Sequence, residues 1–335
     1  MFLFVILILF LAVAIAVTPA FHAFTYKLNK YKDSLKYLIW NKDIPHESHR
    51  SNFIRAGTMR PENNGTQKIR ILFIRHGQSV WNSVYSEMTI CLPIRIVRAL
   101  ILEAKYFFTR PLDSQFIDTP LSAKGIKQAK DLANFVRGAE GKITCDTTTS
   151  VVLCSNLRRT MQTALIGLSP RLNLTGEKIV VDSALQEGSG FIDTQSFSTE
   201  SGKIAPFTFP GFEDPEKVQN MFDAHLNKGN KPLGVDVDAR TDDFLLHIFG
   251  GTIVPAEAGE RGAKDLKEII VFGHSLFFLQ FFRRFLPRSS SHIAKKCTME
   301  NCAVVAFDLI RNVSSGEVVI DENSINPLYK GFIKA

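Results

Sequence analysis

The hydrophobic positions of the chain fall into short, nearly uninterrupted runs that are separated by longer amphipathic segments. A run such as Ile69–Ile74 is typical of a strand buried on both faces of a parallel sheet, because neither face is mainly polar. The runs predicted to form strands are Ile69–Ile74, Ser150–Leu153, Ile179–Val181, Glu268–Phe272, Cys302–Leu309 and Glu317–Ile320.

The segments between these runs carry apolar residues at helical spacing. Ser122 is a good N-cap for a helix whose apolar face contains Ile126, Ala129, Ala133 and Val136. Further helices are predicted over Asn156–Leu168 and Ser275–Leu286, and the phenylalanines of the latter are expected in the core. Strands that alternate with helices predict an α/β fold, a three-layer α/β/α sandwich with a mostly parallel central sheet.

The first twenty residues, Met1–Ala20, contain no charged side chain. Because a helix needs about 20 apolar residues to cross the hydrocarbon of a bilayer, this run predicts a transmembrane helix. The alternative is a signal peptide cleaved near Thr18–Ala20, which would direct the chain into the secretory pathway. No basic segment precedes the run, which favours the anchor. We therefore predict a single-pass membrane protein with its folded domain in the cytoplasm.

The charge of the chain is concentrated after this run. The 335 residues carry 40 Lys and Arg against 33 Asp and Glu, a net charge of +7. Residues 21–70 hold ten basic and four acidic side chains, a net charge of +6, so residues 71–335 carry only +1. The basic segment is predicted to be a juxtamembrane linker. A nearly neutral domain without a basic stripe argues against nucleic acid as a partner.

Side chains suited to binding an anion stand at successive strand ends. Arg75 and His76 follow the first strand, Arg159 follows the second, and Glu187 and His274 come after later strands. Ligands of α/β folds bind beyond the carboxyl ends of parallel strands. The five side chains are therefore expected to converge on one site.

These residues lie in motifs through which the chain resembles the histidine phosphatase superfamily, the phosphoglycerate-mutase-like proteins. The matching stretches, in order, are RHGQSVWN (75–82), DTPLSAKGIKQA (118–129), SNLRRTMQT (155–163), LQE (185–187) and VFGHS (271–275). The register of the third motif selects Arg159, and Arg158 is expected to face solvent or a surface ion pair. The resemblance extends over roughly residues 68–308, and five motifs in the expected order make it specific.

The chemistry of these side chains agrees with that resemblance. Neutral His76 can attack phosphorus and form a phosphohistidine, while Arg75 and Arg159 offer planar cationic forks to the phosphate. His274 and the amide of Asn82 can hold phosphoryl oxygens. Glu187 is the candidate general acid for the departing alkoxide and then the base for the attacking water.

No metal and no cofactor is predicted, because the arginines and histidines supply the positive charge that a metal ion would otherwise give. The five cysteines also lack paired CxxC spacing, so they do not indicate a zinc site. Cys154 is expected to be an inert thiol in the core.

The chain departs from the family pattern by two insertions. Residues 83–117 separate the first two motifs and contain a helical pattern with Ile94, Val97, Ile101 and Phe108 on one side. An extra packed helix or a lid is favoured there over a second membrane contact. Residues 193–267 lie where the family builds its substrate cap, and they do not reveal a substrate.

The function predicted from these observations is a phosphomonoester phosphatase that acts on a phosphorylated small molecule or a phosphoprotein. The chain lacks the elements that mutases use to protect the phosphoenzyme from water. A phosphoglycerate-mutase-type phosphomutase and a non-catalytic, phospho-ligand-binding membrane scaffold are the alternatives. The predicted organisation is an anchor or signal at 1–20, a basic juxtamembrane linker at 21–66 and the phosphatase-like domain at 67–335.

Overall fold

The computed structural model describes residues 18–41, 43, 65–85, 90–139, 142–197, 200–254 and 266–333. Its centre is one mixed sheet in the order β4-β3-β2-β5-β1-β6-β7, with β8 also paired to β6. The strands are β1 (Thr66–Arg75), β2 (Ser150–Cys154), β3 (Ile179–Val181), β4 (Phe222–Asp223), β5 (Glu268–Gly273), β6 (Val304–Asn312), β7 (Val318–Ile320) and β8 (Asn326–Tyr329). Strands β1 to β5 pair in parallel, and β6 runs antiparallel to β1, β7 and β8.

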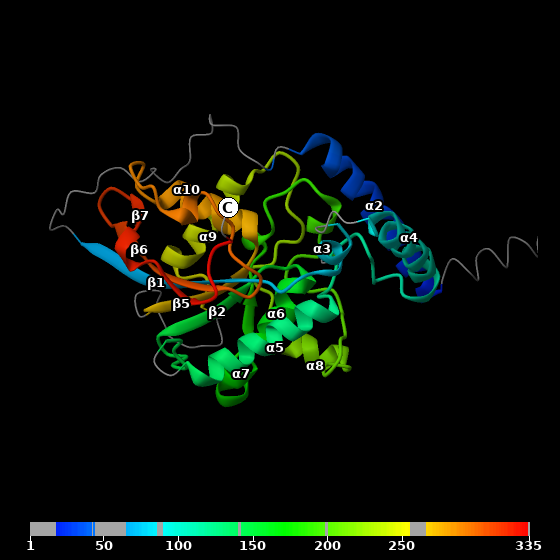
Figure 1. Cartoon of the computed structure of the whole chain (residues 1–335), viewed down its shortest axis with the longest axis horizontal. Helices are drawn as coiled ribbons and strands as arrows, with labels where there is room; N and C mark the ends of the chain where they lie inside the picture. The colour runs from blue at the N-terminus through cyan, green and yellow to red at the C-terminus, as the bar shows by residue number, and fades with distance from the viewer. Residues whose placement is uncertain are drawn as a thin grey trace, which may run out of the picture.

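Helices cover both faces of this sheet (Figure 1). Helices α5 (Ala123–Gly138), α6 (Arg158–Gly167), α7 (Ser169–Thr175) and α8 (Pro215–Asn220) lie on one side. Helices α9 (Val237–Gly250) and α10 (Ser275–Phe285) lie on the other. The predicted α/β fold with a mostly parallel sheet is confirmed, and Ser122 caps α5 by accepting from the Gly125 amide at 3.1 Å.

Strand β1 shows why the apolar runs had to be continuous. Ile71 and Phe73 pack into the core beneath α9 and α10, while Leu72 and Ile74 face the core beneath α5 and α6. All four side chains are fully buried. A strand between two helical layers needs apolar residues on both faces.

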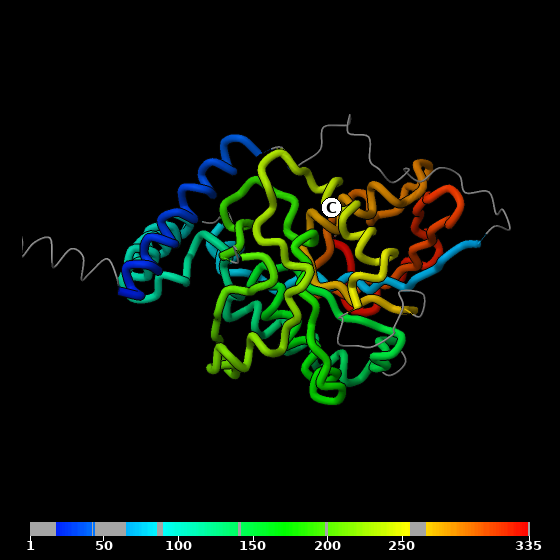
Figure 2. Tube along the Cα trace, turned by 180° about the vertical axis from the view of Figure 1, so that it is seen from behind, coloured from blue at the N-terminus to red at the C-terminus, as the bar shows by residue number. Residues whose placement is uncertain are grey.

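The segment before β1 differs from the predicted linker, because residues Pro19–Trp40 form a helix, α2. Thr18 caps it by accepting from the Phe21 amide. Helix α2 runs beside α4 (Leu92–Thr109), which follows the short helix α3 (Val80–Tyr85) (Figures 1 and 2). A buried ion pair of 2.8 Å between Lys27 and Glu103 joins α2 to α4.

The predicted single-pass membrane localisation is contradicted. Within the described residues, no helix combines the length and the apolar character needed to cross a bilayer. Helix α2 contains Lys27, Lys30, Lys32, Asp33 and Lys36, and charged side chains are costly in hydrocarbon. Residues 1–17, on which most of the prediction of a transmembrane anchor or signal rested, lie outside the described residues.

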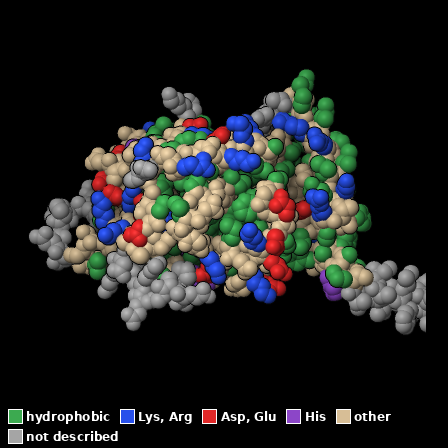
Figure 3. Space-filling view, turned by 90° about the horizontal axis from the view of Figure 1, so that it is seen from below, with side chains coloured by type: hydrophobic (Ala, Val, Ile, Leu, Met, Phe, Trp, Pro, Cys, Tyr) green, Lys and Arg blue, Asp and Glu red, His purple; other side chains and the backbone are tan. Residues whose placement is uncertain are grey.

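The predicted helix of the first insertion is present as α4, but its apolar stripe faces outward. Ile94, Val97, Ile101 and Phe108 are 55–82% exposed, whereas Ala99 and Glu103 are buried. Figure 3 shows hydrophobic side chains at the surface of the end of the molecule that carries α2 and α4, with Lys and Arg side chains among them. The helix therefore packs through Ala99, Glu103 and a second apolar pair, Ile96 and Phe107, and not through the predicted stripe.

Candidate active site

The first and last predicted motifs meet because their strands are neighbours. Strands β1 and β5 are parallel, and Arg75 lies opposite Gly273. The backbone therefore leaves both strands at the same edge of the sheet. The amide of His76 then donates to the Gly273 carbonyl at 3.1 Å. This places His76 beside His274, and their ring centroids are 5.1 Å apart.

The second motif fixes the loop that follows His76. Gly77 and Gly125 lie in backbone contact, since a Cβ on Gly77 would come within 2.7 Å of the Gly125 carbonyl oxygen. Gln128 accepts from the amide of Gln78 at 2.8 Å, and the hydroxyl of Ser122 donates to the Gln78 side chain at 2.9 Å. Glycine is required at both contact points because any side chain would force the loop and helix α5 apart.

His76 is held in a form suited to nucleophilic attack. Its Nδ1 lies 2.6 Å from the carbonyl oxygen of Gly77, which can only accept a hydrogen bond, so Nδ1 carries the proton. Its Nε2 is then the unprotonated nitrogen. Burial lowers the pKa of His76 well below its ordinary value, and the charges of Arg159 and Arg75 lower it further. The imidazole is therefore neutral at physiological pH.

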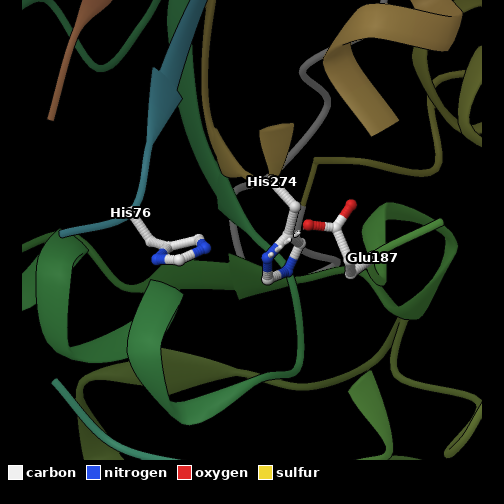
Figure 4. A group of neighbouring side chains, drawn as sticks. All are labelled: His76, Glu187 and His274. Atoms are coloured by element: carbon white, nitrogen blue, oxygen red, sulfur yellow. Dashed lines mark ion pairs between the residues drawn. The ribbon is translucent and has the colours of Figure 1, made fainter. Parts of the chain in front are cut away.

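His274 and Glu187 lie side by side, next to His76 (Figure 4). The Oε1 atom of Glu187 accepts from the amides of Leu276 and Phe277, both at 3.2 Å, so the N-terminus of α10 holds the carboxylate. Its Oε2 is 4.0 Å from Nδ1 of His274, beyond hydrogen-bond range. Burial, followed by the charge of Arg159, lowers the pKa of His274 well below its ordinary value, so this contact joins a neutral ring to the carboxyl group.

Two guanidinium groups complete the arrangement. Arg75 donates to the carbonyl of Met299, and Arg159, from the first turn of α6, donates to the carbonyl of Asp193 at 2.8 Å. Both arginines are at least nine-tenths buried. Because guanidinium groups stay charged when buried, the site is strongly electropositive.

Two sequence predictions about neighbouring residues turn out differently. Of the two expectations for Arg158, solvent exposure is wrong, because its side chain is 1% exposed, whereas an ion pair is present, 3.0 Å from Asp113, whose side chain is 43% exposed. Asn82 is half-buried, and its side-chain oxygen accepts from the hydroxyl of Ser79 at 2.9 Å. Phosphate binding by Asn82 stays a prediction.

The structure also brings in residues that sequence reasoning missed. Asp193, in the 3-10 helix Ile192–Thr194, lies with Oδ2 3.7 Å from the guanidinium of Arg159. Burial raises the pKa of Asp193 to about 6, against the attraction of Arg159. Ser155 bonds Nε2 of His274 at 2.9 Å. Ser155 stands in a quoted motif and could have been found, whereas Asp193 opens an insertion that matches no motif.

Nitrogen and oxygen atoms of His76, Glu187 and His274 lie within 4.8 Å of one another, a spacing that could hold a metal ion. The electrostatic surroundings fit an anion better. Arg75 and Arg159 lower the pKa of His76, and the same positive potential disfavours a bound cation. The donor set around the two imidazoles is therefore suited to the oxygens of a phosphate group.

The comparison with known families agrees with this geometry. Residues 114–315 match the histidine phosphatase superfamily (branch 1). Since this range is more than half of the 335 residues, the chain belongs to that superfamily. The match begins after the first motif, and β1 adds Arg75 and His76 to it through its pairing with β5.

The solved structures to which the chain is similar have low sequence identity to it. A mycobacterial glucosyl-3-phosphoglycerate phosphatase is 19% identical, covers 76% of this chain and 97% of its own, and has a TM-score of 0.37. A phosphoserine phosphatase from Entamoeba histolytica is 13% identical, covering 77% and 96%, with a TM-score of 0.34. A phosphoglycerate mutase from Bacillus anthracis is 15% identical, covering 76% and 92%, with a TM-score of 0.34. No curated protein matches the chain.

Proposed function

We propose that the protein is a phosphomonoester phosphatase that works through a phosphohistidine on His76. The observation that carries the proposal is the hydrogen bond from Nδ1 of His76 to the Gly77 carbonyl, which leaves Nε2 as a buried, neutral nucleophile. Arg75 and Arg159 provide the positive charge that a phosphoryl group requires as it is transferred.

In the first step, Nε2 of His76 forms a bond to phosphorus while the bond from phosphorus to the ester oxygen breaks. Glu187 gives its proton to the departing alkoxide. Oε1 of Glu187 is committed to the amides of α10, so Oε2 is the oxygen that exchanges the proton. In the second step, a water attacks phosphorus, the Glu187 carboxylate takes a proton from it, and the N–P bond breaks to restore neutral His76.

The test is the variant His76→Ala, assayed for phosphate release from an aryl phosphate. Because the variant lacks the nucleophile, we expect activity at the background level. Rapid quenching of wild-type protein after mixing with ³²P-labelled substrate should trap acid-labile phosphohistidine. Equal turnover by wild type and His76→Ala would refute the proposal.

A phosphomutase is the second candidate, and the burial of all five site residues favours it, because a mutase must keep water from its phosphoenzyme. The two reactions differ in where the phosphoryl group goes. Release of inorganic phosphate in proportion to substrate consumed supports the phosphatase. Transfer to a second hydroxyl of the substrate without release supports the mutase.

A further inference from the structure

A buried cluster of charged side chains forms hydrogen bonds with the backbone of the loop that carries Glu187. The ammonium group of Lys231 donates to the carbonyl oxygens of Glu187 and Ser189, both at 2.6 Å. Arg240, on α9, donates to the carbonyl of Gln186. The two cations thus bond three backbone carbonyls around the proposed general acid.

The counter-ion of both cations is Asp43, which lies beyond the C-terminus of α2. Its Oδ2 is 2.5 Å from Nζ of Lys231 and its Oδ1 is 2.6 Å from the guanidinium of Arg240. Asp43 is fully buried, and its carbonyl accepts from the amide of Val237 at 3.0 Å. Tyr37, at the end of α2, stacks its ring 4.8 Å from the Lys231 ammonium. The end of α2 and Asp43 are therefore in contact with the residues that hold the Glu187 loop.

Charge balance explains why a carboxylate is needed there. Burial lowers the pKa of Lys231 to about 8, and the neighbouring charge of Asp43 opposes that shift. Without Asp43, two cations would lie next to each other away from water, and one or both would lose its fixed position.

We propose that Asp43 and Lys231 are positioning residues that align the carboxyl of Glu187 for proton transfer to the leaving group. This inference rests on the proposed function. Asp43 and Lys231 act through the main chain of residues 186–189 and not on the substrate itself. A segment outside the range that matches the family thereby takes part in the chemistry of the site.

The experiment compares two substrates that need the general acid to different degrees. An alkyl phosphate has a basic leaving group that must be protonated, whereas 4-nitrophenyl phosphate expels a stable phenolate with little help. The quantity to compare is kcat/KM, because it reports the step that forms phosphohistidine and excludes its later hydrolysis. For both Asp43→Asn and Lys231→Met, we expect kcat/KM to fall about 10-fold or more for the alkyl phosphate and less than about 2-fold for the aryl phosphate.

Lys231→Met also covers the case in which Asp43→Asn does not fold. It removes the two hydrogen bonds to the Glu187 loop but leaves Asp43 paired with Arg240, so the buried charges stay balanced. The matched control is Lys27→Met, which breaks another buried ion pair of α2 that does not contact this loop. In the control, both substrates should keep the wild-type ratio of kcat/KM.

The outcomes separate this inference from the proposed function. A selective loss on the alkyl phosphate supports the positioning role. An equal loss on both substrates, or no loss in folded Lys231→Met, overturns it while leaving the phosphatase intact. Absence of His76-dependent phosphate release from the wild type overturns the proposed function before the variants are compared.

Discussion

The imidazole of His76 lies against that of His274, with the ring centroids 5.1 Å apart and the ring planes inclined by 60°. Burial and the nearby guanidinium groups lower the pKa of both rings. If both rings gained a proton, four cations would share one buried site. The pair is therefore held neutral by its surroundings.

The first prediction is that activity persists at a pH where ordinary histidines are protonated. His76 is the nucleophile only when neutral, and its lowered pKa extends the neutral form to pH values below 6.5. The acid limb of a plot of kcat/KM against pH should therefore not follow a group with a pKa near 6.5. Imidazole ¹⁵N shifts of His76, followed from pH 8 to pH 5.5, should remain those of a neutral ring. Titration of His76 near pH 6.5 in the folded protein would contradict the assignment.

The second prediction separates two adjacent arginines. Arg159 lies in the site, whereas Arg158 bonds Asp113 and the Leu112 carbonyl and stacks its guanidinium 4.9 Å from the ring of Phe197. Arg159→Lys replaces the planar fork by a point charge, so kcat/KM should fall by about 10²-fold.

Arg158→Lys is the matched control. It loses hydrogen bonds in a structural cluster, so we expect the free energy of unfolding to fall by about 1–3 kcal/mol. Its kcat/KM should stay within about 3-fold of wild type, because Arg158 lies outside the predicted phosphate site. The opposite pattern, with Arg158→Lys the less active variant, would mean that the third motif was read in the wrong register. Denaturant unfolding and steady-state kinetics measure the two effects separately.

The contrast between these two arginines shows what the sequence could predict. Arg75, His76, Arg159 and Glu187 stand in local motifs beside buried strands, and the mostly parallel character of the sheet follows from the alternation of apolar runs with helical segments. The burial of Arg158 could not be foreseen, because it depends on Asp113 and Phe197, which are distant in the chain.

The contacts of Asp43 and Lys231 with the Glu187 loop could not be predicted from the sequence for the same reason. Asp43 and Lys231 are 188 positions apart, and neither stands in a recognisable pattern. The basic charge of residues 21–70 predicts a juxtamembrane linker there and not a packed helix. In the structure Lys27 and Lys30 are buried, while Leu28 and Trp40 are more than half exposed. Hydrophobic periodicity does not predict the buried face when buried charges, together with a few aromatic contacts such as Tyr31–Phe107, hold a helix in place.

The third prediction concerns Asp193 and the pH dependence of stability. Its pKa is about 6 in the folded protein against 3.8 ordinarily, so the folded state holds this proton more tightly than the unfolded state. The stability that this group contributes is fully present below about pH 3.8 and is lost as the pH rises through about 6. Between pH 4 and pH 7, the free energy of unfolding of wild type should therefore fall by about 2 kcal/mol relative to Asp193→Asn.

Asp146→Asn provides the comparison for that measurement. Hydrogen bonds from Thr148 and Thr149 lower the pKa of Asp146 to about 2, so its contribution is lost only as the pH falls below about 4. Between pH 4 and pH 7, the free energy of unfolding of this variant, measured with denaturant, should change with pH as that of wild type does. If the free energy of unfolding of Asp193→Asn also changed with pH as that of wild type does, Asp193 would be ionised throughout this range.

The fourth prediction tests whether charged residues hold α2 against α4. Glu103 accepts from Lys27, from the hydroxyl of Tyr31 at 2.6 Å and from the amide of Gln115 at 2.6 Å, and it is 5% exposed. Burial lowers the pKa of Lys27, and the Glu103 carboxylate opposes that shift. Lys27→Met leaves this carboxylate without its cation, so we expect the free energy of unfolding to fall by about 3–5 kcal/mol.

Ile101→Ser, on the same helix α4, should change the free energy of unfolding by no more than about 0.5 kcal/mol, although isoleucine is the more hydrophobic residue. The reason is that Ile101 is 65% exposed, so its removal takes little apolar surface out of the folded core. The double variant Lys27→Met/Glu103→Gln should regain most of the loss of Lys27→Met, since it removes both buried charges together and keeps an amide oxygen that can accept from Tyr31 or Gln115. Denaturant unfolding of the three variants decides the matter: a larger loss for Ile101→Ser than for Lys27→Met would mean that α4 packs through its apolar stripe.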